Sequence, residues 1–379
     1  MDNLTHSLVG LAAAKSGLER LSPGATGLCV LAANAPDADI AVLLFSDRWG
    51  FLQHHRGITH SIVGTITLAL LLPLLFYLGD LVLAKLQNRS PAVNLRGLLI
   101  ASLLVSATHP IMDWTNNYGV RFFLPWDSRW FYGDLVFIVD PFIWLLLGSA
   151  CFLLSARTRV SSAFWLIVAA VVTALMFLSP RGNLPQPWLI RSVWISGLLT
   201  VLILYVKRVG AKLGPKVAWS SLALVVVYWT FLAFAHSIAL RQAGEEAATL
   251  APSDEAISRL AAMPTLANPF GWDCVFATDK ATYRFKLSLL SDDPVTRLVR
   301  YGRPTGQLDR ALREVSDDRR AQVFLGFARF PVARLSTQDC TAQTLVQLAD
   351  LRYTEPGTQR GAFSLELPVD CGGGLTVNK

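Results

Sequence analysis

Residues 54–61 read His54-His55-Arg56-Gly57-Ile58-Thr59-His60-Ser61, and an apolar run that extends to residue 84 follows directly. This stretch decides the fold, because an apolar run of about 20 residues is long enough to cross a bilayer as a helix. The chain has six histidines, and half of them lie in this stretch. Imidazole binds metals and carries protons near neutral pH. The sequence therefore predicts a reaction centre at the mouth of a membrane helix.

The composition indicates an integral membrane protein with a more polar C-terminal part. Hydrophobic residues make up 53% of the chain and charged residues 16%, against about 25% charged residues in typical soluble domains. The net charge is +7, which in a membrane protein more often reflects basic cytoplasmic loops than nucleic-acid binding, so we expect no nucleic-acid partner. We also expect no detached signal peptide, because Asp2 and His6 interrupt the first apolar run.

Further apolar segments lie on both sides of this span. Residues 4–18 form a short helix candidate, and residues 25–45 are long enough to span, although a polar stretch at 34–39 interrupts them. The other candidate spans are 96–112, 137–155, 161–179, 189–206 and 217–240. Residues 1–240 are thus predicted to form a mainly α, polytopic membrane bundle of about seven or eight segments.

The distribution of basic residues predicts the orientation of this bundle. If every segment crosses, one set of alternate loops carries only positive charge, from Lys85, Arg89, Arg96, Arg157, Arg159, Lys207, Arg208, Lys212 and Lys216. The positive-inside rule assigns these loops to the cytoplasm. The histidine-rich stretch and the C-terminal part are then expected outside, which in a Gram-negative inner membrane is the periplasm.

Residues 241–379 are predicted to form a small α+β domain on the outer side. Residues 254–262 have a helical pattern, and 273–277 with 282–290 alternate around Thr278-Asp279-Lys280, which predicts a hairpin. Further strands are predicted at 321–330, 344–353 and 362–369. This part contains three cysteines, an odd number that leaves at most one disulfide there: Cys274, Cys340 and Cys371. The other two cysteines, Cys29 and Cys151, lie in apolar segments and are expected to be packing residues.

Polar side chains gather at one depth of the predicted bundle, and four separate segments contribute them. The candidate metal ligands are His6, Asp37, His55, His60, His109 and Asp113. His109 and Asp113 are four residues apart, so on a helix they share a face. Pro36 and Pro110 are each predicted to break a span beside these ligands, and broken backbone at membrane depth is tolerated mainly where it lines a cavity.

Mixed nitrogen and oxygen ligands suit Zn²⁺, Mn²⁺ or Fe. We expect one or more bound ions and favour Zn²⁺ among these metals. Asp39 or His54 would take a proton from water or orient a ligand. Arg56 would clamp a phosphate oxygen through its guanidinium. The competing interpretation is that these polar groups only pack and hydrogen-bond within the bundle.

The same residues resemble a known family. Four motifs occur in the order found in the YdjM-like inner-membrane family, whose members are described as metal-dependent hydrolases: Asn3-Leu4-Thr5-His6-Ser7-Leu8, Ala35-Pro36-Asp37-Ala38-Asp39, His55-Arg56-Gly57-Ile58-Thr59-His60-Ser61 and His109-Pro110-x-x-Asp113. The likeness covers roughly residues 1–145, and 268–272 resemble longer members. A more distant likeness to zinc-dependent phospholipase C implies that His6, Asp37, His60, His109 and Asp113 are zinc ligands. Those enzymes are soluble and carry further His and Glu ligands, which have no clear equivalents here.

The sequence thus favours a multi-pass inner-membrane hydrolase that uses a divalent metal to cleave a phosphoester or related bond of a membrane lipid or lipid-linked substrate. Two alternatives stay open. One is a non-enzymatic transporter or ion-binding protein, although the apolar segments within residues 141–240 hold almost no ionisable groups, whereas a transporter should carry matching polar breaks in both halves. The other is an envelope scaffold that acts through its C-terminal domain, whose protein partner the sequence does not identify.

Overall fold

The computed structural model describes residues 1–178, 187–337, 343–357 and 363–370. The chain divides into two compact units. The first comprises Met1–Asp39, Arg56–Phe234 and Pro264–Pro269, and the second comprises Ile40–His55, Ala235–Met263 and the residues from Phe270 onward.

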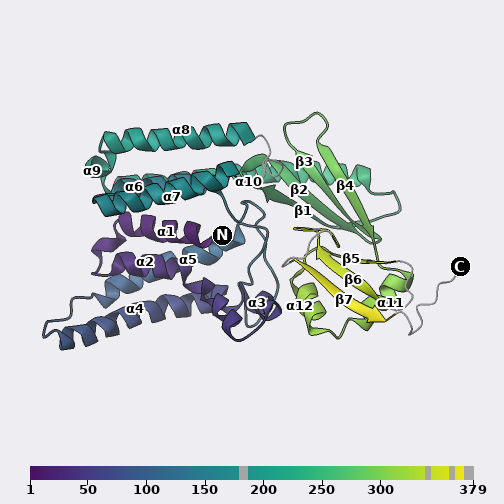
Figure 1. Cartoon of the computed structure of the whole chain (residues 1–379), viewed down its shortest axis with the longest axis horizontal. Coiled ribbons are helices and arrows are strands. Elements are labelled where there is room, and N and C mark those ends of the chain that lie inside the picture. Colours follow the sequence, from purple (N-terminus) through teal and green to yellow (C-terminus); the bar gives the residue numbers. More distant parts are fainter. Residues whose placement is uncertain (179–186, 338–342, 358–362, 371–379) are drawn as a thin grey trace. The chain divides into compact units, whose positions relative to one another are not determined.

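The first unit consists mainly of helices that run alongside one another (Figure 1). Contacts join α1 to α2 and α6, α5 to α2 and α4, and α6 to α7, α8 and α9. Two short 3-10 helices, η1 and η3, lie in the turns before α2 and α4. The elements are α1 Asn3–Lys15, η1 Leu18–Arg20, α2 Ala25–Asn34, η2 Ala35–Leu44, η3 Ile58–His60, α4 Ile62–Leu86, α5 Leu95–Trp114, α6 Pro141–Ser155, α7 Arg159–Leu178, α8 Pro187–Val206, α9 Val209–Leu213 and α10 Pro215–Leu250. Both η2 and α10 continue into the second unit.

Five helical segments among the described residues are long and apolar enough to cross a membrane. They are Ala25–Leu44, Ile62–Leu86, Leu95–Trp114, Arg159–Phe177 and Pro215–Leu250. Two further helices, Pro141–Ser155 and Ile190–Val206, are apolar but shorter. Leucine side chains of α4 such as Leu70, Leu74 and Leu78 are exposed, as expected of a helix that faces lipid. The chain is therefore a multi-pass membrane protein, and the predicted total of seven or eight segments stays a prediction.

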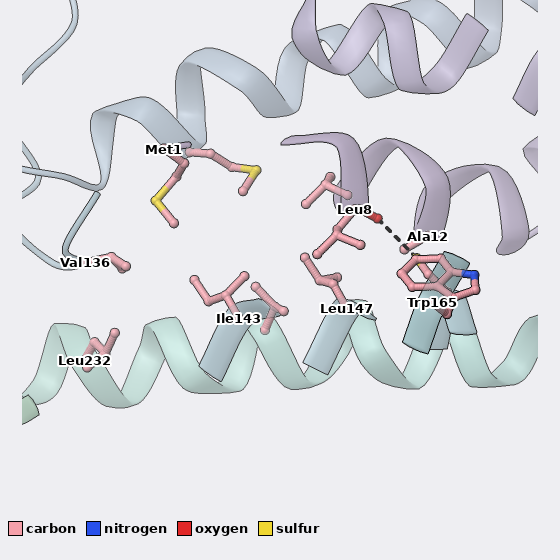
Figure 2. Close-up of a cluster of buried hydrophobic side chains, with 12 residues drawn as sticks. Met1, Leu8, Ala12, Val136, Ile143, Leu147, Trp165 and Leu232 are labelled. Carbon is pink, nitrogen blue, oxygen red and sulfur yellow. Dashed lines mark hydrogen bonds between the residues drawn. The ribbon is translucent and has the colours of Figure 1, made fainter. Parts of the chain in front are cut away.

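The core of this unit forms where α1 packs against α6 (Figure 2). Leu8 and Ala12 of α1 belong to the same buried cluster as Ile143 and Leu147 of α6. The thiol of Cys151 donates to the Leu8 carbonyl at 3.6 Å, so this cysteine fills space in the core. Cys29 is likewise a buried free thiol, and both cysteines lie in the core as predicted.

Glycine at position 10 allows α1 to approach α2 closely. A Cβ at Gly10 would lie 2.6 Å from the Cys29 carbonyl oxygen and 3.0 Å from the Ala33 Cβ. We expect Gly10→Ala to lower the free energy of unfolding by about 1–3 kcal/mol, because backbone atoms of α2 would have to move. Thermal unfolding of the purified chain measures this. Gly27→Ala is the matched control, since nothing lies within 4 Å of its Cβ position, and it should be neutral or stabilising by up to about 1 kcal/mol.

The two prolines beside the predicted ligands behave differently. Helix α2 ends at Asn34 and continues as the 3-10 helix η2, so Pro36 interrupts the segment as predicted. The prediction that Pro110 breaks its span is wrong, because α5 runs through it from Leu95 to Trp114. A proline within a packed membrane helix is tolerated when neighbouring helices and side chains satisfy the freed backbone group.

The second unit contains two antiparallel sheets and short helices. The first sheet has the strand order β1-β2-β3-β4 and the second has the order β5-β6-β7. Helix α12 contacts both α3 and β7. The elements are α3 Arg48–His54, β1 Ile257–Thr265, β2 Asn268–Thr278, β3 Ala281–Ser288, β4 Val295–Gly302, α11 Gly306–Glu314, α12 Arg319–Phe327, β5 Pro331–Leu335, β6 Gln343–Asp350 and β7 Ser364–Asp370.

The hairpin predicted around Thr278 is confirmed. Strands β2 and β3 pair antiparallel with Ala277 opposite Thr282, and the Thr278 hydroxyl accepts from the backbone N–H groups of Lys280 and Ala281. The strands predicted at 344–353 and 362–369 correspond to β6 and β7. Cys274 is a buried free thiol, and desolvation raises its pKa well above the ordinary value. Cys340 and Cys371 lie outside the described residues, so a disulfide in this part stays a prediction.

Two predictions for this unit are wrong. Residues 254–262 were expected to be helical, but β1 begins at Ile257, because pairing with β2 overrides the helical preference of its alanines. Residues 321–330 were expected to be a strand, but most of them belong to α12. Asp318 caps this helix by accepting from the Arg320 N–H, and Ala321, Phe324 and Phe327 are buried at intervals of three residues, as on one helix face.

Candidate metal centre

Four predicted ligands from three elements of the first unit converge on one point. Asp37 lies on η2, His60 ends η3, and His109 with Asp113 lies on α5. One ligand atom from each residue can be chosen so that all four lie within 4.8 Å of one another. His60, His109 and Asp113 are fully buried, whereas the side chain of Asp37 is 14% exposed. The sole partly open side of this cluster is therefore that of Asp37.

The spacing of these atoms fits a single tetrahedral metal ion. The His60 Nε2 atom lies 3.3 Å from both Asp37 Oδ1 and Asp113 Oδ2. The His109 Nε2 atom lies 3.6 Å from the same two oxygens, and the two Nε2 atoms are 3.1 Å apart. Ligand atoms around tetrahedral zinc, with bonds of about 2.0–2.1 Å, are roughly 3.3 Å apart. The five distances scatter around this value.

Helix α2 fixes the protonation of His109. Its Nδ1 atom lies 2.6 Å from the carbonyl oxygen of Ala33. A carbonyl only accepts, so Nδ1 carries the proton, and in the neutral ring Nε2 presents a lone pair to the cluster. In a 3-10 turn this carbonyl would accept from residue 36, but Pro36 has no N–H. The proline thus leaves the carbonyl available to orient His109.

His60 is held in a similar way. Its Nδ1 atom lies 3.5 Å from Asp39 Oδ2 and 3.1 Å from the Thr59 hydroxyl. His60 precedes the span that begins at Ile62, and burial lowers its pKa to about 3, because desolvation disfavours the charged ring. The ring is therefore neutral at physiological pH, the form that binds metals. A carboxylate behind the ligand nitrogen is a common device for orienting metal-bound histidines.

We expect Asp39→Ala to weaken metal binding about 10–100-fold, because outer-shell partners of ligating histidines have effects of this size. Competition with a chromophoric chelator measures the affinity of the purified chain. Asp127→Ala is the control, because it removes a more exposed carboxylate that pairs with Arg129 at 2.7 Å. An unchanged affinity in Asp39→Ala would contradict the orienting role.

Arg56 contacts protein acceptors rather than open space. Its Nε atom lies 3.0 Å from Asp113 Oδ2, and its backbone N–H donates to Asp39 at 3.0 Å. One terminal nitrogen donates to the Asp113 carbonyl, to Asn116 Oδ1 and to the Gly119 carbonyl. The predicted clamping of a phosphate oxygen stays a prediction. These contacts favour a residue that positions Asp113.

His6 adjoins the cluster from α1. Its ring is fully buried and stacks on His109 with a centroid distance of 3.8 Å. Its Nε2 atom lies 3.3 Å from Asp113 Oδ1, the oxygen that the amino group of Met1 also contacts. His6 therefore lies beside the four-ligand set, on the other oxygen of a shared carboxylate.

The remaining two predicted residues belong to the second unit. His54 is the last residue of α3 and is exposed, and His55 caps the helix with its ring 4.6 Å from Phe51. Their predicted roles in catalysis and metal binding stay predictions.

Asn116 is a buried polar residue that the sequence reading did not select. Its Oδ1 atom accepts from Arg56 and from the Tyr118 N–H, and its Nδ2 atom has no hydrogen-bond partner among the described residues. It follows the candidate ligand Asp113 by three residues, and this spacing is the feature of the sequence that could have indicated its place beside the site. Asn116 belongs to the support of Arg56.

These features define the class of protein: a multi-pass membrane protein with a buried histidine and aspartate cluster that fits a metal ion. Residues 1–184 match the sequence profile of the family described as YdjM inner membrane protein. The predicted family resemblance is confirmed, and the protein is an inner membrane protein.

Among curated proteins, the chain is similar to the "Uncharacterized protein YfhP" of Bacillus subtilis (strain 168). The two are 28% identical over 155 residues, which cover 38% of this chain and 43% of the relative. The match therefore spans less than half of either protein. No solved structure matches the chain significantly. The likeness to zinc-dependent phospholipase C stays a prediction.

Proposed function

We propose that the protein is a membrane-bound, metal-dependent hydrolase that cleaves a phosphoester or related bond of a lipid-linked substrate. One observation carries the proposal: two carboxylate oxygens and two imidazole nitrogens, all electron-pair donors, lie 3.1–3.6 Å apart in the pairs measured. Such atoms repel one another unless a cation lies between them. A divalent ion supplies Lewis acidity, which polarises a phosphoester and lowers the pKa of water toward about 7.

The chain's own groups prepare this site. The Ala33 carbonyl and Asp39 hold His109 and His60 with their Nε2 lone pairs directed inward. Arg56 holds Asp113 through its guanidinium. Asp39, which lies next to the partly open side at Asp37, is our candidate for accepting a proton from water.

A lipid-linked substrate is supported by the apolar side chains next to the ligands. Ile58 and Ile62 flank His60 in sequence and are 49% and 48% exposed, and Ile111, between His109 and Asp113, is 50% exposed. Within a membrane bundle such side chains face lipid. A lipid-linked substrate in the bilayer would therefore lie beside η3 and α5, the elements that carry His60, His109 and Asp113.

We further propose that the site faces the periplasm, together with residues 241–379. The support is the one-sided distribution of Lys and Arg over alternate loops of the bundle. A reporter enzyme that is active only outside the cytoplasm, fused after residue 379, should be active. If this fusion is inactive, and a fusion at the same position to a reporter that is active only in the cytoplasm is active, the C-terminal part lies in the cytoplasm and the proposed orientation is wrong.

A second candidate is a non-enzymatic ion-binding protein. It is favoured by the burial of His60, His109 and Asp113 and by the presence of four protein ligands. Structural zinc sites have four protein ligands, whereas catalytic sites keep an open position. In that case chelation would lower the thermal stability of the protein, and no substrate would be hydrolysed.

The test uses the purified, metal-loaded chain in lipid nanodiscs. It is offered lipid phosphomonoesters and phosphodiesters, and the release of water-soluble phosphate compounds is followed. We expect hydrolysis that EDTA abolishes, that Asp113→Asn reduces to background and that Asp127→Asn leaves unchanged. If the protein binds metal and loses stability on chelation, but hydrolyses none of these lipids, the ion-binding function replaces the hydrolase.

A further inference from the structure

A second polar site, separate from the histidine and aspartate cluster, lies in the first unit where the ends of α6 and α8 meet α9 (Figure 1). A cavity of about 630 Å³ opens there. Arg157, which follows α6, and Arg208, which precedes α9, both line it, and no carboxylate does. Tyr205 contributes a hydroxyl-bearing ring, and Leu153 and Val206 contribute apolar wall. The cavity therefore combines two positive charges with a hydrocarbon surface.

Carboxylates that could neutralise these arginines are missing from their part of the chain. No Asp or Glu occurs between Asp140 and Glu245. None of the ion pairs found within the described residues involves Arg157 or Arg208. Lys207 and Lys212 add positive charge nearby in sequence. An anion in the cavity would offset the repulsion between these groups.

The backbone brings the two arginines together through a specific turn. Arg208 adopts a left-handed conformation, with φ 55° and ψ 37°, as it ends the connection from α8 to α9. Gly210 then lies so close to α6 that a Cβ would be 2.0 Å from the Leu153 carbonyl oxygen. Only glycine allows this approach, and it places α9 beside the end of α6. The juxtaposition thus depends on the local sequence.

The surroundings select the kind of anion. Leu202, Ile203 and Val206 of α8 are 55%, 53% and 71% exposed, so lipid-facing surface runs up to the charged cavity. A ligand that lies here meets guanidinium groups at one end and hydrocarbon at the other. Arginine binds phosphate oxygens with two parallel hydrogen bonds, and basic pockets between membrane helices bind anionic head groups.

We propose that this cavity binds the phosphate-bearing head group of an anionic phospholipid, with Arg157 and Arg208 as its ligands. The site is separate from the metal cluster and does not depend on the proposed hydrolase activity. The lipid stabilises the junction of α6, α8 and α9, while its acyl chains lie against the exposed side chains of α8.

The experiment measures lipid retention by native mass spectrometry. The full chain is released from nanodiscs that contain equal amounts of phosphatidylglycerol and phosphatidylcholine. We expect wild-type protein to retain phosphatidylglycerol preferentially, and Arg157→Ala/Arg208→Ala to retain it about 30-fold more weakly, since each basic group near a membrane contributes about a factor of five. Arg157→Lys/Arg208→Lys keeps the charge and should retain part of the preference, which would show that positions 157 and 208 tolerate substitution.

Arg89→Ala is the matched control. It removes the same charge from another loop, but its guanidinium already pairs with Asp80 at 2.5 Å, so lipid retention should not change. The proposal is overturned if the double alanine variant keeps the wild-type preference or if Arg89→Ala loses it equally. It is also overturned if millimolar inorganic phosphate displaces the lipid, because the site would then bind free phosphate.

Discussion

His60→Ala is expected to remove the bound metal from the purified protein. The Nε2 atom of His60 lies closer to the carboxylates than that of His109 does, at 3.3 Å from both Asp37 and Asp113, and it is 3.1 Å from His109. Its loss leaves two carboxylates and one imidazole, and we expect metal affinity to fall by more than the roughly 100-fold upper effect of an outer-shell residue.

Metal content per chain, measured by mass spectrometry of the elements after gel filtration, tests this. His236→Ala is the matched control: its ring lies 5.3 Å from that of Trp272 in the second unit, and metal content should stay at the wild-type level. Circular dichroism and the elution volume show whether the variants keep the native helix content and size.

A double-variant comparison separates a shared ion from separate effects. If His60 and His109 hold the same ion, the second substitution has little left to remove, so His60→Ala/His109→Ala should resemble either single variant. Wild-type metal content in both single variants would refute the cluster as a metal site. Independent, additive losses would mean that the two residues bind different ions.

The sequence could predict the convergence of ligands but not the roles of their neighbours. Asp37, His60, His109 and Asp113 were selected because polar groups in membrane segments are costly, and the structure brings these four together. The acceptors around Arg56 come from Asn116 and Gly119, after α5. No local pattern at Arg56 indicates that residues 113–119 lie beside it in the fold. The sequence alone therefore cannot distinguish an arginine that positions Asp113 from one that binds a phosphate.

The two units differ in how far the sequence determines their elements. A helix that crosses a bilayer must satisfy its own backbone and present an apolar run of fixed length, so α4, α5 and α7 follow from composition. In the second unit, residues 257–265 form a strand because β2 lies beside them, despite two alanines that favour a helix. Residues 321–330 were predicted to be a strand, but most of them belong to α12, whose first turn Asp318 caps.

Arg352→Ala is expected to destabilise the second sheet by about 3–5 kcal/mol, the usual cost of removing one partner from a buried ion pair. The side chains of Arg352 and Asp350 are both 0% exposed, and two guanidinium nitrogens lie 2.7 and 2.8 Å from Asp350 Oδ2. Arg352 also donates to the Phe327 carbonyl at 3.0 Å, while Asp350 accepts from the Arg329 N–H. The pair therefore joins the end of β6 to the end of α12.

The chain provides a control with the same residue types, spacing and distance. Arg320 pairs with Asp318 at 2.7 Å, but these side chains are 45% and 28% exposed, and exposed pairs contribute about 0–1 kcal/mol. Hydrogen exchange of the β6 amides in the full chain measures local opening, which should become more than 100-fold more frequent in Arg352→Ala and change less than about fivefold in Arg320→Ala. Because the two pairs have the same length, equally large effects would show that burial does not set the contribution of Arg352. A change below about fivefold in Arg352→Ala would show that the pair is incidental to the stability of the sheet.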